Sequence, residues 1–412
     1  MSSQERIVIL GAGHAGGRVA AALRKKGFEG RLQLVGDETD PPYERPPLSK
    51  EALAEGADPL VNRINDDAFY ADNAIELLLG TPARRLDLAA RRLELQGDAS
   101  PLDFDTLILA TGCRARELPL PGADHPRVLT LRSAADSRRL RPLLRAGAKV
   151  VLIGGGFIGL EVAASAAKLG CEVTVLEALP QLLGRALAPQ IADFLAAQHL
   201  AAGVEIVTGA QVAEIRHGEM ESEVRLVDER GFTAEVIVVG IGATLNDELA
   251  QEAGLDCENG ILVDSACRTG AEGIYAIGDV THHENLRLGR RLRLESWENA
   301  ELQAEIAAAG ILGQAAACDA VPWFWTDQHG VNLQLLGYGE AWDEEVLRGT
   351  PDDGAFAAFY LRDGRIVMAA LANSGRERRP LKQLIESGAQ VSAAELADSS
   401  TSLRDLAKRL TK

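Results

Sequence analysis

The chain has 412 residues, of which 46% are hydrophobic and 25% are charged, a composition typical of a globular protein with two or three domains. Its formal net charge of −17 argues against a nucleic-acid partner, because a phosphate backbone needs a basic surface. The sequence contains no apolar run of the roughly 20 residues that span a bilayer, and it has no signal-peptide pattern. We therefore expect a cytoplasmic protein with neither a membrane nor a nucleic-acid partner.

Two stretches of the chain have the same order of strand, glycine-rich turn, helix and strand. Residues 6–37 contain RIVIL, GAGHAG, GRVAAALRKKG and LQLVGD, and residues 149–177 contain KVVLI, GGGFIG, LEVAASAAKLG and EVTVLE. Each stretch predicts a βαβ unit with parallel strands. The chain thus carries two copies of one mononucleotide-binding unit.

The first glycine turn, between strand and helix, has the spacing Gly11-x-Gly13-x-x-Gly16. In this pattern the first glycine makes a tight turn, the second lets the backbone approach a pyrophosphate, and the third lets the helix pack on the strand. The N-terminus of the helix then offers free N–H groups to the phosphates. Asp37, at the end of the second strand, is placed to accept hydrogen bonds from ribose hydroxyls.

The second turn repeats the pattern as Gly154-x-Gly156-x-x-Gly159, with Glu177 at the end of the following strand. Two complete fingerprints in one chain predict two bound dinucleotides. Hydride chemistry between two such cofactors indicates a nicotinamide and a flavin.

Glu177 predicts a preference for NADH over NADPH. A carboxylate about 4 Å from the additional phosphate of NADPH would cost roughly 4 kcal/mol at an effective dielectric constant of 20, which favours NADH by about two to three decades. Arg185 leaves two interpretations open, since an arginine could pair with that phosphate or lie solvated after the strand.

The remaining predicted elements lie between and after the two units. A strand ends near Gly112, and the proline-rich LPLPG that follows it predicts a crossing between domains. The run IYAIGDV ends a strand at Gly278-Asp279, where the carboxylate can accept ribityl hydroxyls or simply start a turn. Further strands and helices are predicted at 235–242, at 298–313, in short β-type runs from 321 onward, at 379–388 and at 402–412.

Together these residues resemble the FAD-dependent, NADH-oxidising ferredoxin reductases, above all the reductase components of bacterial aromatic-ring dioxygenases of the biphenyl and phenylpropionate type. The segments that carry the resemblance are GAGHAG, PPYERPPLSK, LILATG, VLIGGGFIGLEVAA, VVGIG, IYAIGDV, ESWENA and WFWTDQ. PPYERPPLSK and WFWTDQ are the most specific. They also occur in rubredoxin, P450-ferredoxin and apoptosis-inducing-factor relatives, so they indicate the superfamily better than the acceptor.

The resemblance implies an α/β fold with two Rossmann-like, glutathione-reductase-like domains and a C-terminal α+β domain. The expected FAD-binding domain is discontinuous and comprises 1–112 and 243–316. The NADH-binding domain would be 113–242 and the C-terminal domain 317–412.

The resemblance also implies roles for individual residues. Lys50 would lie near the flavin N5 edge, paired with Glu161, although by sequence alone it is also a plausible exposed lysine. The expected FAD contacts are Gly11, Gly13, His14, Ala15, Gly16, Asp37, Arg45, Lys50, Pro82, Ala110, Thr111, Gly112, Arg132, Gly278, Asp279, Trp297 and Trp325, and the expected NADH contacts are Gly154, Gly156, Phe157, Ile158, Gly159, Glu177, Arg185 and Gly242. Because Trp323 and Trp325 lie on one strand-like run, we expect only one of them to face a given side.

The positions of the cysteines exclude two related chemistries. The five cysteines have no CxxC or zinc-type spacing, which predicts idle thiols of a reducing compartment and no metal site. No cysteine precedes Cys113, although pyridine nucleotide–disulfide relatives carry a redox cysteine early in the chain. Dithiol and sulfenate chemistry are therefore not expected, and electrons would leave the flavin directly.

The function implied by the resemblance is electron transfer from NADH through FAD to a [2Fe–2S] ferredoxin, which would supply a terminal oxygenase acting on an aromatic compound. A local basic surface, with 287–293 as one candidate, would dock the acidic ferredoxin, unless this segment is only a solvated loop. Two alternatives remain open: an NADH-dependent reductase of rubredoxin, P450 ferredoxin, quinone or oxygen, and a non-enzymatic signalling protein of the apoptosis-inducing-factor type.

Overall fold

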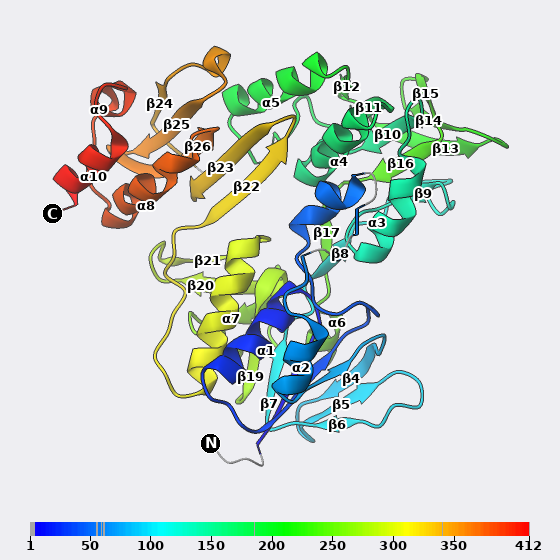
Figure 1. The fold of residues 1–412 in the computed structure, drawn as a ribbon, viewed down its shortest axis with the longest axis vertical. Coiled ribbons are helices and arrows are strands. Elements are labelled where there is room, and N and C mark those ends of the chain that lie inside the picture. Colours follow the sequence, from blue (N-terminus) through cyan, green and yellow to red (C-terminus); the bar gives the residue numbers. More distant parts are fainter. Residues whose placement is uncertain are drawn as a thin grey trace. The chain divides into compact units, whose positions relative to one another are not determined.

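The computed structural model describes residues 5–54, 57, 58, 60, 62–184, 186–339 and 341–411. The chain divides into two compact units. Unit 1 comprises Met1–Pro47, Leu60–Arg114 and Ala243–Ala320, and unit 2 comprises Leu48–Pro59, Ala115–Gly242 and Val321–Lys412. The chain leaves unit 1 in β8 (Cys113–Ala115) and re-enters it in β17 (Ala243–Leu245), which Figure 1 shows in cyan and green.

Unit 1 is built on a five-stranded parallel sheet in the order β19-β7-β1-β2-β3. Side chains of β1 alternate between two cores: Ile7 and Ile9 face α1 and α7, whereas Val8 and Leu10 face the other side. Both sets are buried, which explains the uninterrupted apolar run of this strand. The elements are β1 (Arg6–Leu10), α1 (His14–Lys25), β2 (Arg31–Val35), β3 (Ile75–Leu78), β7 (Thr106–Leu109), β19 (Ile274–Ala276) and α7 (Trp297–Ile311).

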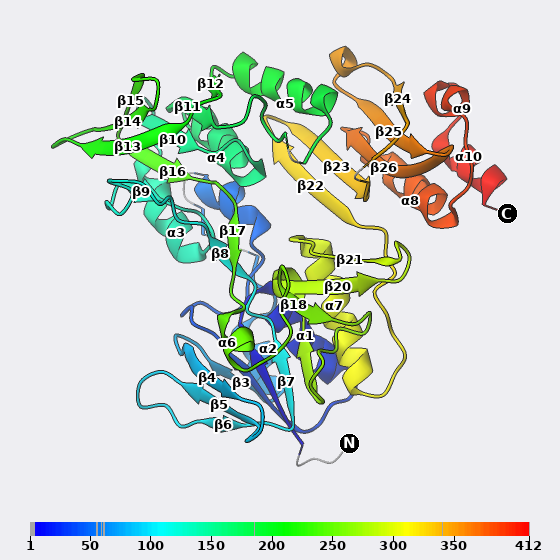
Figure 2. The same cartoon turned by 180° about the vertical axis from the view of Figure 1, so that it is seen from behind.

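Helices α1 and α7 lie side by side on one face of this sheet (Figures 1 and 2). Their contact is made largely by alanines, whose small side chains let the two helices approach closely. Smaller elements complete unit 1: the sheet β4 (Ala83–Asp87), β5 (Arg92–Leu95) and β6 (Leu102–Asp103); the sheet β18 (Ile261–Val263), β20 (Thr281–Asn285) and β21 (Arg290–Leu292); and the helices α2 (Asp67–Asp72) and α6 (Glu248–Glu252).

Unit 2 contains a second five-stranded parallel sheet, in the order β12-β11-β10-β16-β9. It repeats the strand–turn–helix–strand arrangement of unit 1. Its elements are β9 (Val128–Leu129), α3 (Ala134–Leu140), β10 (Lys149–Ile153), α4 (Phe157–Lys168), β11 (Glu172–Glu177), α5 (Pro189–Ala201), β12 (Glu205–Thr208) and β16 (Val236–Val239), with a small antiparallel sheet of β13 (Val212–His217), β14 (Ser222–Leu226) and β15 (Gly231–Ala234).

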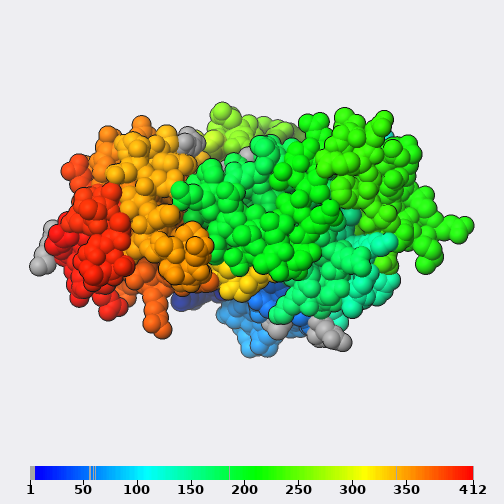
Figure 3. All heavy atoms as spheres, turned by 90° about the horizontal axis from the view of Figure 1, so that it is seen from above, coloured from blue at the N-terminus to red at the C-terminus, as the bar shows by residue number. Residues whose placement is uncertain are grey.

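The C-terminal part of unit 2 is an antiparallel sheet, β22-β23-β26-β25-β24, covered by helices on one side. In Figure 3 its orange atoms adjoin the green atoms of α5, where Phe194 and Phe356 meet with ring centroids 5.0 Å apart. The elements are β22 (Trp323–Gln328), β23 (Val331–Gly337), β24 (Glu344–Arg348), β25 (Phe356–Arg362), β26 (Arg365–Ala372), α8 (Arg378–Ser387), α9 (Ala393–Ala397) and α10 (Leu403–Leu410).

The predicted fold class is confirmed, because two parallel nucleotide-binding sheets and a C-terminal α+β part are present. Among the described helices, none combines the length and the apolarity needed to cross a membrane. Within the same residues, no group of three or more His, Cys, Asp or Glu side chains is arranged to hold a metal ion. None of the five cysteines is part of a disulfide bond.

Candidate functional site

The first glycine turn, in unit 1, leaves an uncapped helix N-terminus of the kind that binds phosphates. Gly11 has φ +115°, and a Cβ there would lie 2.2 Å from the carbonyl oxygen of Ala110. Helix α1 starts directly after Gly13, which supplies no side-chain cap, and its first turn contains no acidic residue. Uncapped N–H groups in a helix turn that carries no carboxylate of its own fit the pyrophosphate of FAD.

The turn in unit 2 has the same construction. Gly154 has φ +108°, and a Cβ there would lie 2.5 Å from the carbonyl oxygen of Gly240. Helix α4 starts at Phe157 after Gly156, again without a side-chain cap or an acidic residue in the first turn. The exposed Ile158 follows in that turn. This site therefore also fits the pyrophosphate of a dinucleotide.

Glu177 is held at the end of β11 by two backbone N–H groups. Its Oε2 accepts a hydrogen bond from the N–H of Gly155 at 2.7 Å, and its Oε1 accepts one from the N–H of Leu179 at 2.8 Å. The carboxylate is thus fixed beside the glycine turn, where a ribose would lie. Arg185 lies outside the described residues.

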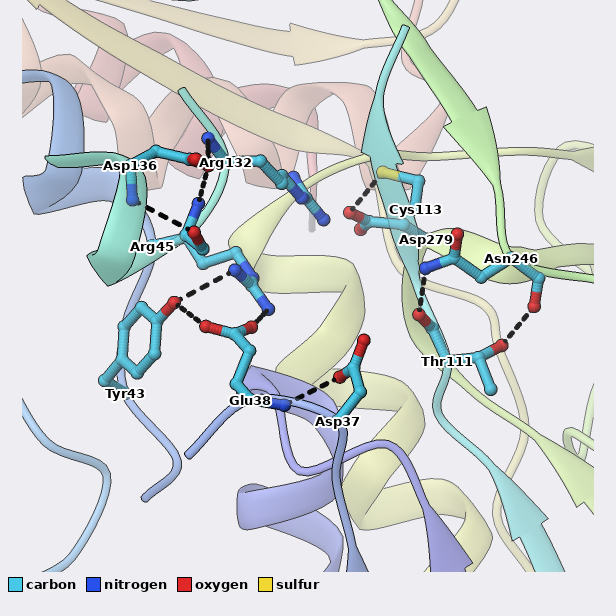
Figure 4. Close-up of polar contacts among 11 residues, drawn as sticks. Asp37, Glu38, Tyr43, Arg45, Thr111, Cys113, Arg132, Asp136, Asn246 and Asp279 are labelled. Atoms are coloured by element: carbon cyan, nitrogen blue, oxygen red, sulfur yellow. Dashed lines mark hydrogen bonds and ion pairs between the residues drawn. The ribbon is translucent and has the colours of Figure 1, made fainter. Parts of the chain in front are cut away.

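In unit 1 the proline-rich run contributes to a polar cluster of Glu38, Tyr43 and Arg45 (Figure 4). Of these three residues, only Arg45 is among the expected contacts. Glu38 accepts hydrogen bonds from the Tyr43 hydroxyl at 2.5 Å and from Arg45 Nη2 at 2.7 Å. Burial opposes the charge on Arg45, but Tyr43 and Glu38 outweigh it and raise the pKa of the guanidinium above its ordinary value. Asp37 is exposed, and its Oδ1 accepts the N–H of Glu38. Arg45 Nη2 would lie 3.4 Å from a Cβ at Gly13, so a fixed cation adjoins the phosphate turn.

Two further pairs fix the loops after β7 and β19 in unit 1 (Figure 4). The Thr111 hydroxyl donates to the carbonyl of Asn246 at 2.6 Å, and the Asn246 amide donates back to the carbonyl of Thr111 at 2.9 Å. Asp279 Oδ2 lies 3.6 Å from the Cys113 thiol, and the N–H of Gly278 donates to Gln303 at 2.7 Å. The Thr111 side chain therefore anchors its own loop.

Other expected FAD contacts of unit 1 lie near the same turn or the strand ends. Trp297 is the first residue of α7, and its ring lies 5.5 Å from the ring of His14. His14 Nε2 in turn lies 2.7 Å from Glu301 Oε1. Ala15 and Gly16 lie in the first turn of α1, Ala110 and Gly112 lie in the loop after β7, and Pro82 precedes β4.

In unit 2 a buried ion pair joins Lys50 to helix α4. Lys50 Nζ lies 2.9 Å from Glu161 Oε2, and the Glu161 side chain is only 3% exposed. Ser49 donates to the same oxygen at 2.5 Å, and Thr326 of β22 donates to Oε1 at 2.6 Å. The geometry brings together the two residues that the family resemblance paired, and it adds Ser49 of PPYERPPLSK and Thr326 of WFWTDQ, which were not among the expected contacts.

The expectation that only one of Trp323 and Trp325 faces a given side is wrong. Their rings are stacked, with centroids 4.9 Å apart and planes inclined by 16°. Residues two apart in a strand point to the same face, which is the physical reason for the error. The guanidinium of Arg378 covers the other face of Trp323 at 4.3 Å.

The last expected contacts occupy loop and cap positions of unit 2. The N–H groups of Arg132 and Ser133 donate to Asp136, at 3.0 and 2.9 Å, where α3 begins. Gly242 closes the loop after β16, with φ +112°, and its carbonyl accepts the N–H of Arg116.

Two parallel five-stranded sheets, each with an uncapped glycine turn after its central strand, define a protein that binds two dinucleotides. A family model described as pyridine nucleotide-disulphide oxidoreductase matches residues 5–304, and one described as the reductase C-terminal matches residues 323–407. The chain belongs to the pyridine nucleotide-disulphide oxidoreductase family.

Comparison with individual proteins shows which members of this family the chain resembles. The chain is 41% identical, over 98% of its length and 99% of the relative's, to the ferredoxin–NAD(+) reductase component of the anthranilate 1,2-dioxygenase system of Burkholderia cepacia. It is 35% identical to putidaredoxin reductase in its covalent complex with putidaredoxin, with a TM-score of 0.95 and 99% of each chain covered. The ferredoxin reductase for the CYP199A2 system of Rhodopseudomonas palustris is 36% identical, with a TM-score of 0.94, and the match covers 98% of this chain and 100% of that one. The resemblance to ferredoxin reductases is confirmed.

Proposed function

We propose that the chain is a ferredoxin–NAD(+) reductase that passes electrons from NADH through FAD to a [2Fe–2S] ferredoxin, which supplies an aromatic-ring-hydroxylating dioxygenase. The observation that carries this proposal is the pair of uncapped glycine turns, one in each unit, in a chain that matches a dioxygenase-system reductase over nearly its full length. Residues 1–112 and 243–316 would bind FAD, 113–242 would bind NADH, and 317–412 would complete the enzyme.

The residues of unit 1 would bind and orient FAD. The α1 N-terminus would bind the pyrophosphate, Asp37 the ribose, and Arg45, fixed by Glu38, would add positive charge beside the phosphates. Asp279 would accept hydrogen bonds from the ribityl chain. Bound FAD would supply the ability to take two electrons from NADH as a hydride and to release them singly.

The residues of unit 2 would bind NADH and stabilise charge. The α4 N-terminus would bind the NADH pyrophosphate and Glu177 its ribose. Lys50, held by Glu161, would offset negative charge on the reduced flavin. A Lys50→Met variant is therefore expected to bind both cofactors but to be reduced by NADH at least tenfold more slowly in stopped-flow absorbance, and a wild-type rate would contradict this role.

The cysteines support direct transfer from flavin to ferredoxin. The first cysteine of the chain is Cys113, and its thiol faces Asp279. Cys267 and Cys318 approach within 4.0 Å, but both are buried in the core of unit 1, and the hydrogen bond with Cys318 together with burial raises the pKa of Cys267. A buried, protonated thiol is a poor nucleophile, so a dithiol relay is not needed.

The alternative acceptor with specific support is a P450-system ferredoxin, because the structural relatives at 35% and 36% identity are a putidaredoxin reductase and the ferredoxin reductase for the CYP199A2 system. Cytochrome c reduction driven by NADH, with a panel of dioxygenase and P450 ferredoxins, tests the proposal. We expect a dioxygenase-type ferredoxin to give the highest kcat/KM. Turnover with oxygen alone at the same rate would contradict it.

We further propose a cytoplasmic location, because five free thiols fit a reducing compartment. Cell fractionation followed by immunoblotting tests this proposal. Recovery of the protein with a membrane or periplasmic fraction would contradict it.

A further inference from the structure

A chain of hydrogen bonds continues from Glu161 across unit 2 to a pair of histidines. Gln328 Nε2 lies 2.9 Å from Thr326 Oγ1, and Gln328 Oε1 lies 2.9 Å from His199 Nε2. His199 Nδ1 in turn lies 3.0 Å from His329 Nε2. With the contact of Thr326 to Glu161, the chain spans α4, β22, α5 and the turn after β22.

The chain is buried along most of its length. Glu161, Thr326, Gln328 and His199 are each at most 2% exposed, whereas His329 is partly exposed. Buried polar groups of this kind are costly unless each has a partner. Here every link has one, so the chain is a built network.

The chemistry of the groups fixes the direction of every hydrogen bond. The Glu161 carboxylate only accepts, so the single hydroxyl proton of Thr326 points to it and the Thr326 oxygen accepts from the Gln328 amide. The Gln328 carbonyl must then accept from His199 Nε2–H, which leaves His199 Nδ1 to accept from His329 Nε2–H. Burial lowers the pKa of His199 to about 4, so His199 is neutral at pH 7 and fits this pattern.

The far end of the chain lies in a tight hairpin turn. His329 and Gly330 form the two-residue connection between β22 and β23, and both have positive φ, +48° and +78°. Histidine, like asparagine and aspartate, is among the non-glycine residues that adopt a positive φ most readily. At this position the His329 ring packs edge-on against His199, with centroids 4.4 Å apart.

We propose that Thr326, Gln328 and His199 are positioning residues that hold Glu161, and through it Lys50, in the geometry the reductase reaction needs. The proposal rests on the role proposed above for Lys50. The chain orients groups and does not conduct protons, because the Gln328 amide cannot pass on a proton without becoming an imidic acid. His329 closes the chain whether it is neutral or protonated, since its Nε2 donates in both forms.

The hydroxyl group of Thr326 is the member of the hydrogen-bond chain that can be removed with the least change in side-chain shape, because valine and threonine have nearly the same shape. Thr326→Val removes the donor to Glu161 and leaves the Gln328 amide without its acceptor, whereas Thr326→Ser keeps the hydroxyl. Thr174→Val is a matched control, because the Thr174 hydroxyl of β11 contacts the Glu205 carboxylate at 2.9 Å on the surface of the same unit. Stopped-flow reduction by NADH gives the rate constant and the NADH Kd separately.

We expect Thr326→Val to lower the rate constant of flavin reduction about tenfold, the loss typical of one hydrogen bond to a charged group, with the NADH Kd unchanged within a factor of about two. Thr326→Ser and Thr174→Val should retain the wild-type rate. A wild-type rate in Thr326→Val would overturn the proposal. So would a loss in Thr326→Ser as large as that in Thr326→Val, because bulk and not the hydroxyl would then matter.

A second measurement does not depend on turnover. In ¹⁵N-histidine NMR of the purified flavoprotein at pH 7, His199, assigned with a His199→Asn variant, should be the Nε2–H tautomer in the wild type and a tautomer mixture in Thr326→Val. An Nδ1–H tautomer in the wild type would overturn the proposal. A wild-type rate in Lys50→Met would instead contradict the role of Lys50. The tautomer of His199 would then be the measurement that decides whether the hydrogen-bond chain exists as described.

Discussion

Glu177 combines a structural and a recognition role in one carboxylate. Because both oxygens accept backbone N–H groups beside the glycine turn, its negative charge is fixed where the additional phosphate of NADPH would lie. Glu177→Ala should therefore lower the ratio of kcat/KM for NADH to that for NADPH by about two decades. Steady-state kinetics with both nucleotides measures it. Glu205→Ala, a change of the same charge in the adjacent strand β12, should leave the ratio unaltered, and an equal effect there would refute the assignment.

Because His283 in unit 1 is buried, we expect the free energy of unfolding to decrease at acidic pH. Burial first, and then His282 and Arg291, lower the pKa of His283 to about 4. Since the unfolded value is about 6.5, the unfolded chain binds the extra proton first, so the free energy of unfolding decreases as pH falls from 6.5 toward 4. The loss at pH 5 is about 2 kcal/mol.

Urea unfolding at pH 7 and pH 5 measures this dependence. His283→Leu, which also removes the ring nitrogen Nδ1 that has no hydrogen-bond partner among the described residues, should remove about 2 kcal/mol of the difference. An unchanged difference between the two pH values in this variant would show that other groups are responsible. His199 should make a similar contribution in unit 2, where burial lowers its pKa to about 4 as well.

At the scale of elements, the strand–turn–helix junction before α4 should tolerate no side chain at its first glycine. In Gly154→Ala the new methyl group would collide with the carbonyl of Gly240 and occupy an unfavourable φ. We expect the NADH Kd to rise at least tenfold while FAD content is retained, as measured by equilibrium titration and the flavin spectrum.

Gly147→Ala is the control for backbone strain alone, because Gly147 also has positive φ but faces open space. It should cost about 1 kcal/mol of stability without changing the NADH Kd by more than about twofold. Equal weakening of NADH binding in both variants would show that strain, and not the close approach at Gly154, matters.

The sequence predicted elements whose local pattern is strong. The strands at 149–153, 172–177 and 323–328 have the predicted bounds, because apolar runs there end at glycine or at polar turns. Helix α1 starts at His14, three residues before the expected helical run, because Gly16, the third glycine of the fingerprint, lies in its first turn.

Contacts between distant segments were beyond the sequence. Thr326 and Glu161 are 165 positions apart, and nothing in the sequence around either residue indicates that the two are in contact. Lys50 was paired with Glu161 only through the family resemblance. The order of the strands and the stacking of Trp323 on Trp325 likewise follow from tertiary packing, although correct use of the two-residue strand period would have predicted the latter.

For the whole molecule, a net charge of −17 makes the approach of an acidic ferredoxin dependent on a local basic surface. Arg287, Arg290 and Arg291 are exposed around β20 and β21, and Arg287 and Arg291 donate to the carbonyls of Asp319 and Val263. These bonds to backbone carbonyls fix the two guanidinium groups, and Arg287 also pairs with the Asp319 carboxylate at 4.0 Å, which offsets part of its charge.

We expect the ferredoxin KM to rise as ionic strength increases from about 0.01 to 0.15 M, which shortens the Debye length from about 30 to 8 Å. Steady-state cytochrome c reduction measures it, with a neutral quinone acceptor as the control. A ferredoxin KM that does not change with salt would rule out electrostatic steering.

The three-segment composition of unit 1 determines the order in which the protein can fold during synthesis. Edge strand β19 and helix α7, which close the sheet and cover α1, are translated only after residues 115–242. The apolar face of α1 therefore emerges from the ribosome long before α7, which covers it, has been made. In contrast, all strands of the parallel sheet of unit 2 lie in one continuous stretch, residues 128–239. A nascent chain stalled before α7 should be a chaperone client, because it exposes half of a hydrophobic core.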